Sequence, residues 1–243
     1  MLVTIITVVY NCETTISRTI ESVLAQTYRD IEYIIIDGVS SDNTVSIANS
    51  YSERFEEYGI KYIVLSEKDS GMYDALNKGA HMAHGEIIGQ INADDWYEPN
   101  AVEKMVALYE REQYDFAWAD LRIIRESGNI IKKAHIGKPW TTAGFCHPTM
   151  FSRKDALEEF PYACRCMDDD FDMITRAYSA NKKIVVLNEV LANYSFGGMS
   201  TKKSIKDFYE RIKMKYSTYR RNGFSRWYLM YCIVIELAKY VLG

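Results

Sequence analysis

The sequence has few prolines, cysteines and histidines, and it lacks an apolar run long enough to cross a membrane. Its 243 residues include only 4 prolines, and no proline-rich or Gly/Ser-rich segment separates one region from another. The 5 cysteines are odd in number and lack the spacing of zinc ligands, so a reducing compartment is expected. A composition of 48% hydrophobic and 26% charged residues excludes a disordered chain and a polytopic membrane protein. The first residues lack a basic leader, which predicts a protein without a secretion signal.

Two common phosphate-binding loops are also missing. The chain contains neither the Gly-x-Gly-x-x-Gly fingerprint of dinucleotide-binding proteins nor the Gly-Lys-Ser/Thr sequence of a P-loop. A phosphate group bound by this protein would therefore need a cation rather than a glycine cradle. The turn after the first predicted strand, Tyr10-Asn11-Cys12-Glu13, also differs from the basic, glycine-rich loop expected of a nucleotidyltransferase.

The periodicity of apolar residues predicts an α/β protein. Strand-like runs alternate five times with helical patterns, which favours a mostly parallel sheet with helices on both faces. The predicted strands cover residues 2–9, 31–36, 60–65, 86–92 and 115–119, and the predicted helices between them include residues 44–58, 71–83 and 99–109. Beyond residue 120 we expect a hairpin at 121–133, short strands at 184–187 and 190–194, and helices at 203–221 and 227–242.

Polar or acidic residues follow four successive predicted strands. They are Tyr10, Asp37, Asp69 and the adjacent pair Asp94 and Asp95. Carboxyl ends of parallel strands meet at one edge of a sheet, which is where α/β proteins bind ligands. Because Mg²⁺ and Mn²⁺ prefer oxygen ligands, the Asp94–Asp95 pair is predicted to hold a metal that contacts a phosphate-bearing substrate. The alternative is a solvated turn, in which aspartates are common.

Four motifs follow one another along the chain: Thr7-Val8-Val9-Tyr10-Asn11, Asp37-Gly38-Val39-Ser40-Ser41-Asp42-Asn43-Thr44, Asp69-Ser70-Gly71-Met72-Tyr73-Asp74-Ala75-Leu76-Asn77-Lys78-Gly79 and Asn92-Ala93-Asp94-Asp95. In this order they resemble the motifs of family 2 glycosyltransferases, which have the GT-A fold. The similarity covers residues 1 to about 200. It implies an inverting transferase that uses a nucleotide-diphosphate sugar, with a UDP-sugar as the expected donor, together with Mn²⁺ or Mg²⁺.

The resemblance implies roles for individual donor-side residues. Tyr10 is expected to stack on or flank the base, and Asp37 to accept a hydrogen bond from it. Asp69 is expected beside the nucleotide, and Asn77 of the same motif among the substrate-binding residues.

The acid pair is the expected metal site. By resemblance, Asp94 approaches the ribose or the metal, and Asp95 holds the metal on the diphosphate, where Lewis-acid stabilisation assists departure of the leaving group. The family pair is often Asp-x-Asp, whereas here the two acids are adjacent. Which of them touches the metal directly is therefore left open.

An inverting transfer also needs a base for the acceptor hydroxyl. The run Asp169-Asp170-Phe171-Asp172 resembles the acidic pair that the family places at a helix start, with Asp in place of the usual first Glu. Asp170 is the first choice for the base and Asp169 the second. An acidic cluster that serves only the helix dipole is the alternative.

Two further features belong to the acceptor side by resemblance. His147, in a Cys-His step, is a candidate to line the cleft, with a satisfied core histidine as the alternative. The loop Phe196-Gly197-Gly198-Met199-Ser200 is expected either to close over the diphosphate or to be a simple turn. The Gln-x-x-Arg-Trp motif of processive members is missing, which favours addition of one sugar per encounter.

The C-terminal region differs in charge from the rest. Residues 202–226 contain nine Lys and Arg against two acids, a balance of +7 in a chain of net charge −4, so the body carries −11. A helix of the last 17 residues would span only about 25 Å, short of a bilayer core of about 30 Å. This basic and apolar tail predicts peripheral membrane contact, and packing on the domain or formation of a homodimer is the alternative.

Together these features predict a cytoplasmic glycosyltransferase at the inner face of the membrane, acting in surface polysaccharide synthesis on a saccharide or lipid-linked saccharide acceptor. The expected division is a catalytic domain at residues 1–200, with a nucleotide-sugar half at 1–120 and an acceptor half at 121–200, followed by a tail at 201–243. A nucleotidyltransferase and a non-catalytic sugar-nucleotide-binding or scaffolding protein are the alternatives. No nucleic acid partner is expected.

Overall fold

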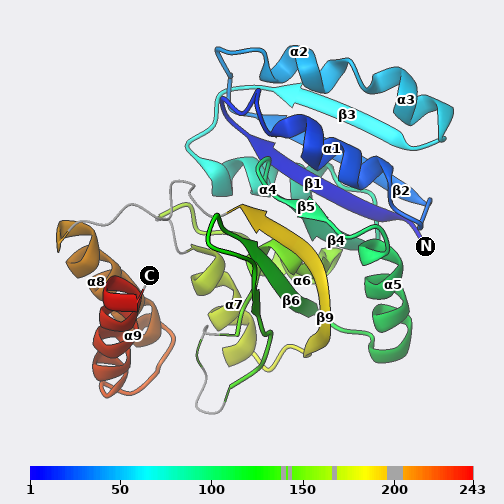
Figure 1. Cartoon of the computed structure of the whole chain (residues 1–243). Helices are drawn as coiled ribbons and strands as arrows, with labels where there is room; N and C mark the ends of the chain where they lie inside the picture. Colours follow the sequence, from blue (N-terminus) through cyan, green and yellow to red (C-terminus); the bar gives the residue numbers. More distant parts are fainter. Residues whose placement is uncertain (138–140, 142–143, 166–168, 196–204, 243) are drawn as a thin grey trace.

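The computed structural model describes residues 1–137, 141, 144–165, 169–195 and 205–242 (Figure 1). In this part of the chain, nine strands form one sheet of order β3-β2-β1-β4-β8-β6-β9-β5, with β7 paired to β6. The strands are β1 (Val3–Val9), β2 (Ile31–Asp37), β3 (Lys61–Ser66), β4 (Ile87–Gln90), β5 (Trp96–Tyr97), β6 (Phe116–Ile124), β7 (Ile130–Lys132), β8 (Phe151–Arg153) and β9 (Ile184–Ser195).

The N-terminal part of the sheet is parallel. β1 pairs with β2 and β4, and β2 pairs with β3, all in parallel register. Every residue of β1 and β2 is buried, which requires cover on both faces of the sheet. The cover comes from α1 (Ile16–Leu24), α2 (Thr44–Asn49) and α3 (Ser52–Glu57) on one face and α4 (Met72–Met82) on the other (Figure 1). The predicted α/β fold class is therefore confirmed.

The second part of the sheet is mixed. β8 runs antiparallel to both β4 and β6, β9 is parallel to β6, and β5 is antiparallel to β9. The predicted hairpin is present as the antiparallel pair β6 and β7. The remaining elements here are α5 (Ala101–Glu112), the 3-10 turn η1 (His147–Thr149), α6 (Lys154–Glu159) and α7 (Asp169–Ser179).

Three expected boundaries are wrong. Residues 184–187 and 190–194 belong to one strand, β9. The strand continues past the exposed polar pair Asn188-Glu189, which lies in an irregularity of its register with β6. The expected strand 115–119 continues to Ile124 along the same partner. The expected helix 44–58 is divided into α2 and α3. In the first two cases the length of the strand is set by pairing with a distant segment and not by local periodicity.

Two helices at the C-terminus pack as an antiparallel pair beside α7, on the opposite side of the molecule from α5 (Figure 1). They are α8 (Ile205–Arg221) and α9 (Tyr228–Leu242), joined by a turn in which Gly223 has a positive φ of 80°. Tyr219 of α8 is fully buried between Phe171 of α7 and Tyr228, and a buried ion pair joins Lys215 to Glu236. Among the described residues, no helix has the length and apolarity needed to cross a bilayer.

Gly85 allows the β1 strand to approach the segment that leads into β4. Its backbone N–H donates to Thr4 Oγ1 at 2.9 Å, and a Cβ placed on Gly85 would collide with the Thr4 backbone nitrogen and lie 2.8 Å from Thr4 Oγ1. We expect Gly85→Ala to destabilise the protein by about 1–3 kcal/mol, since backbone atoms must move apart. Thermal unfolding measures this as a fall in Tm of roughly 3–10 °C. An unchanged Tm would show that this contact has more room than the structure indicates.

Candidate active site

The ends of β2 and β3 bring two acids together. Asp37, the last residue of β2, is fully buried and its Oδ2 accepts hydrogen bonds from the Ser40 N–H at 3.0 Å and the Ser66 hydroxyl at 2.6 Å. A Cβ on Gly38 would lie 2.7 Å from Asp69 Oδ2, so Gly38 provides the space in which the Asp69 carboxylate lies. Asp37 is thus held rigidly next to Asp69 at the carboxyl edge of the sheet.

Tyr10 lies at the rim of the same edge. Its side chain is 63% exposed, and the turn that carries it is tied to the turn after β2. Asn11, at a positive φ of 51°, donates its N–H to Ser40 Oγ at 2.8 Å and accepts from the Ser41 N–H at 2.8 Å. The aromatic ring is therefore free to stack on a ligand, while its backbone is anchored beside Asp37.

Asp94 and Asp95 follow β4 at this edge. Asp95 is fully buried, its Oδ1 accepts from the Ser195 N–H at 3.1 Å, and its Oδ2 is buried without a hydrogen-bond partner among the described residues. Burial raises the pKa of both carboxyls, and the charge of Asp94 raises the pKa of Asp95 further. The backbone oxygen of Asp94 accepts from Arg18 and from the Ser195 hydroxyl, each at 2.8 Å.

The donor set of this pair fits a divalent cation. An ionised carboxylate that is buried and lacks a partner is costly, and a cation at Asp95 Oδ2 removes that cost. In the described part of the chain, no group of three or more His, Cys, Asp or Glu side chains could hold a metal by itself. The two aspartates supply the oxygen ligands that Mg²⁺ and Mn²⁺ prefer.

A second cluster surrounds Asp170, in the first turn of α7. The Oδ2 atom of Asp170 lies 3.4 Å from His147 Nδ1, and its Oδ1 accepts from the Phe171 N–H at 2.7 Å. Burial lowers the pKa of His147, and the charge of Asp170 opposes this effect only in part. A neutral His147 can donate its Nδ1 proton to Asp170 and so orient the carboxylate.

Tyr162 connects the Asp170 cluster to the sheet. Its ring stacks on His147 with 6.4 Å between centroids and an angle of 8°, and its hydroxyl donates to Gln90 Oε1 at 2.5 Å. Gln90 is the last residue of β4, four positions before Asp94. Two buried polar atoms in this cluster, Gln90 Nε2 and His147 Nε2, have no hydrogen-bond partner among the described residues.

Comparison with known proteins agrees with this geometry. A family model described as glycosyl transferase family 2 matches residues 4–172. The chain belongs to glycosyl transferase family 2. It is therefore a glycosyltransferase, as the sequence motifs predict.

Relatives and solved structures are consistent with this assignment. A PGL/p-HBAD biosynthesis glycosyltransferase of Mycobacterium bovis is 30% identical over 204 residues, which cover 80% of this chain and 77% of the relative. The structure of TarS 1–349 of S. aureus in complex with UDP matches at a TM-score of 0.74 and 17% identity, covering 100% of this chain and 72% of that chain. The mannosyltransferase PcManGT of Pyrobaculum calidifontis, in complex with GDP-Man and Mn²⁺, matches at 0.70 and 16% identity, covering 98% and 73%. These structural matches show the GT-A fold.

Within this family 2 glycosyltransferase, the residues singled out in the sequence occupy two clusters. Tyr10, Asp37 and Asp69 lie at the ends of β1, β2 and β3, and Asp94 and Asp95 follow β4. His147 and Asp170 contact each other in the second cluster. Their roles in the reaction stay predictions. The predicted loop Phe196-Gly197-Gly198-Met199-Ser200 lies outside the described residues.

Asn77 and Asp169 make contacts within the protein. The Asn77 side chain donates to the Tyr162 carbonyl at 2.9 Å and accepts from its N–H at 3.0 Å, which holds the Tyr162 segment against α4. Asp169 is fully buried and accepts from the Arg165 N–H. Asp170 remains 20% exposed at its side chain. Of the two acids, Asp170 is the better placed to meet a substrate.

Several residues of the transferase site were not found from the sequence. Tyr162, Gln90, Ser195 and Arg18 belong to no recognised motif, and each contributes through a contact with a residue more than 70 positions away. The pattern of one strand or one helix carries no signal for such contacts. A tyrosine or glutamine becomes a site residue only when the sheet has formed.

Proposed function

We propose that this transferase moves a sugar, with inversion, from a nucleoside-diphosphate sugar to a hydroxyl group of a saccharide acceptor. A UDP-sugar is the expected donor, and a lipid-linked saccharide of a surface polysaccharide is the expected acceptor. The observation that carries the proposal is the buried Asp95 carboxylate, whose Oδ2 has no partner among the described residues, at the sheet edge that also holds Asp37 and Asp69. Residues 1–120 would serve the donor and 121–200 the acceptor.

The donor half is built to hold a nucleotide without a phosphate loop. Tyr10 offers an exposed ring for the base, and Asp37, fixed by Ser40 and Ser66, offers an acceptor oxygen. Asp94 and Asp95 would hold Mn²⁺ or Mg²⁺. The ion, when bound, neutralises charge that develops on the departing diphosphate.

The acceptor half supplies the base. Asp170 takes the proton of the acceptor hydroxyl, the hydroxyl oxygen forms a bond to the anomeric carbon, and the bond from that carbon to the diphosphate oxygen breaks. Attack from the face opposite the leaving group inverts the configuration. The contact with His147 and the bond from the Phe171 N–H hold the Asp170 carboxylate in one orientation.

The metal role of Asp95 can be tested by Asp95→Asn, which keeps the shape of the side chain and removes its charge. We expect the affinity for UDP in the presence of Mn²⁺ to fall by about tenfold or more, because a charge-assisted ligand is lost. Isothermal titration calorimetry measures this, with EDTA as the metal-free reference. Because the variant also removes a buried charge, its Tm without metal should equal or exceed that of the unaltered protein.

The matched control is Asp155→Asn, which makes the same change at a side chain 68% exposed on α6. It should leave UDP affinity unchanged. An Asp95→Asn protein that binds UDP with Mn²⁺ as tightly as the unaltered protein would remove Asp95 from the metal site.

The base can be tested by Asp170→Asn. We expect the donor Kd to stay the same and the transfer rate to fall by about 10²–10⁴, the usual contribution of a positioned general base. Release of nucleoside diphosphate in the presence of acceptor measures the rate, again with Asp155→Asn as control. Near-normal turnover of Asp170→Asn together with an inactive but folded Asp169→Asn would instead identify Asp169 as the base.

We also propose that the α8–α9 pair contacts the membrane. Four large apolar side chains at intervals of three and four residues are exposed on one face of this segment: Trp227 (80%), Met230 (56%), Val234 (60%) and Leu237 (46%). The opposite face is occupied by the contacts of Tyr219 and by the Lys215–Glu236 pair. An apolar stripe beside basic residues is typical of helices that lie in the headgroup region. A lipid-linked acceptor would be presented at that surface.

Met230→Gln combined with Val234→Gln tests this contact without disturbing the buried face. We expect binding to vesicles of anionic phospholipid to weaken by about tenfold, since two apolar side chains no longer enter the lipid. Co-sedimentation measures it. The control is Ile130→Gln with Ile131→Gln, which removes similar exposed side chains from β7. If the double variant binds vesicles as the unaltered protein does, and is a monomer where the unaltered protein is a dimer, the apolar stripe is a dimer interface instead.

A further inference from the structure

A pocket lined by three arginines lies on the side of α7 that faces the C-terminal helices. Its volume is about 400 Å³, and its lining residues are Pro161, Tyr162, Ala163, Arg165, Asp172, Arg176, Arg221 and Asn222. The lining therefore comes from three separate segments: the loop after α6, helix α7 and the end of α8. None of these arginines belongs to a motif that the sequence analysis connects with the donor.

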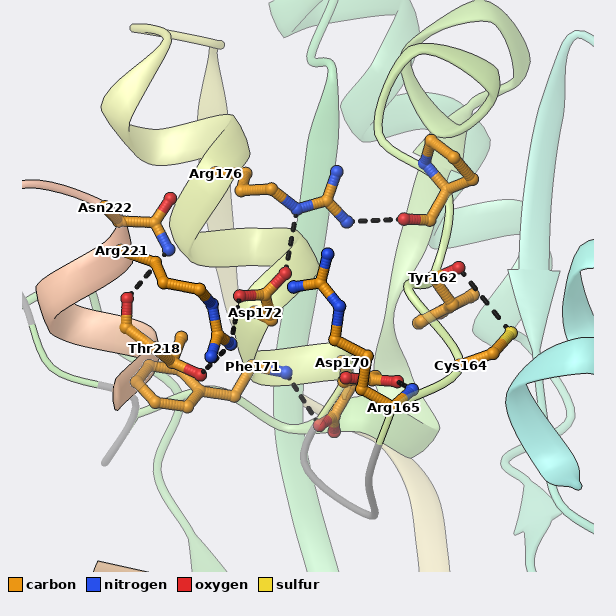
Figure 2. A network of polar contacts seen from close by, with 12 residues as sticks. Tyr162, Cys164, Arg165, Asp170, Phe171, Asp172, Arg176, Thr218, Arg221 and Asn222 are labelled. Atoms are coloured by element: carbon orange, nitrogen blue, oxygen red, sulfur yellow. Dashed lines mark hydrogen bonds and ion pairs between the residues drawn. The ribbon is translucent and has the colours of Figure 1, made fainter. Parts of the chain in front are cut away.

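Asp172 fixes two of the arginines in place. This buried carboxylate, 2% exposed, accepts from Arg176 Nε at 2.9 Å through Oδ2 and from Arg221 Nη2 at 3.1 Å through Oδ1 (Figure 2). Arg176 also donates through Nη2 to the Pro161 carbonyl, and Arg221 donates to Ser217 and Thr218. Both guanidinium groups are thus oriented before any ligand arrives, which lowers the entropy cost of binding.

The pocket carries an excess of positive charge. Three guanidinium groups face a single carboxylate, which leaves a balance of 3 − 1 = +2 among the lining residues. Arg165 is exposed and forms no ion pair with any residue that the structure describes, although Figure 2 shows its guanidinium directed toward Asp172 and Arg176. The Arg176 side chain is 29% exposed and that of Arg221 is 42% exposed, so both can still reach a ligand.

Arginine clusters of this kind select oxyanions. A guanidinium group offers parallel N–H donors that match two oxygens of one phosphoryl group, and it keeps its charge at all physiological pH values. A net charge of +2 on oriented donors suits a group with two negative charges, such as a diphosphate or two neighbouring phosphodiesters. A neutral saccharide has no group that would balance this charge.

The pocket shares a wall with the Asp170 cluster. Tyr162 lines the pocket and also stacks on His147, which contacts Asp170. The N–H of Arg165, which lines the pocket, donates to Asp169, the residue before Asp170 on α7. An anion in the pocket is therefore adjacent to the site where the acceptor hydroxyl must lie, and separate from the Asp94–Asp95 pair beyond β4.

We propose that this pocket binds a phosphoryl group of the acceptor and positions the acceptor hydroxyl at Asp170. The assignment of the anion to the acceptor rests on the proposed transfer reaction, whereas the anion site itself does not. The acceptor class is then a phosphate-bearing saccharide, such as a sugar linked through diphosphate to a lipid. The joining of α8 to α7 by Arg221 and Asp172 gives the C-terminal helices a direct part in this site.

Arg165→Gln tests the pocket, because it removes a charge without leaving the buried Asp172 unpaired. The probe is inorganic diphosphate in EDTA, which leaves the Asp94–Asp95 pair without a cation. We expect the Kd for diphosphate to rise about tenfold, the effect of losing one charge-assisted hydrogen bond, and the salt dependence of binding to become shallower. Arg111→Gln, which removes an exposed arginine on α5, is the control and should change neither quantity. Equal diphosphate affinity in Arg165→Gln and the unaltered protein would overturn the proposal.

Competition with vesicles distinguishes the two sources of the phosphoryl group. If vesicles of phosphatidylglycerol displace diphosphate from the unaltered protein while vesicles of phosphatidylcholine do not, the pocket takes a membrane headgroup, which overturns its assignment to the acceptor. If neither displaces it, a membrane headgroup is excluded as the source of the phosphoryl group, as the assignment to the acceptor requires. Binding of UDP with Mn²⁺ to the unaltered protein tests the proposed function separately. If the unaltered protein does not bind UDP with Mn²⁺ but still binds diphosphate in a manner that depends on Arg165, the proposed donor site is contradicted and the proposed anion pocket is not.

Discussion

The burial of the Asp95 carboxylate is the constraint on which the proposed donor site depends. One oxygen accepts from the Ser195 N–H, the other has no hydrogen-bond partner in the described part of the chain, and burial together with the charge of Asp94 raises the pKa of this carboxyl. Such an arrangement is costly unless a cation completes it. The parallel strands β1, β2 and β4 bring Tyr10, Asp37 and Asp95 to the same edge of the sheet.

The cluster at the ends of β1 to β4 and the cluster around Asp170 are connected through Tyr162. Its hydroxyl binds Gln90 at the end of β4, its ring stacks on His147 beside Asp170, and its backbone is held by Asn77 of α4. The Tyr162 side chain thus connects β4, the strand that leads to Asp94 and Asp95, with His147, which contacts Asp170. Movement of one cluster relative to the other would have to break buried contacts, which keeps the reacting groups in a defined arrangement.

The C-terminal helices pack against helix α7 rather than forming a detached tail. Tyr219 packs on Phe171, and Arg221 binds Asp172, so two contacts join α8 to α7. Part of the basic charge of this segment is used internally, since Lys215 pairs with Glu236 and Arg221 with Asp172. The exposed stripe that begins at Trp227 remains outside these contacts. Both packing and surface contact are therefore compatible with one structure.

The sequence alone determined the α/β class, the family and the acids at the strand ends, because strand periodicity and the motif residues are local and their order along the chain is visible. It did not determine the length of β9, the existence of β5 and β8, or the contacts of Tyr162, since strand pairing and ring stacking join segments far apart in the chain. The three-arginine pocket is the strongest case. Arg165, Arg176 and Arg221 look like ordinary surface cations in the sequence, and only the packing of α8 against α7 places them around one buried carboxylate.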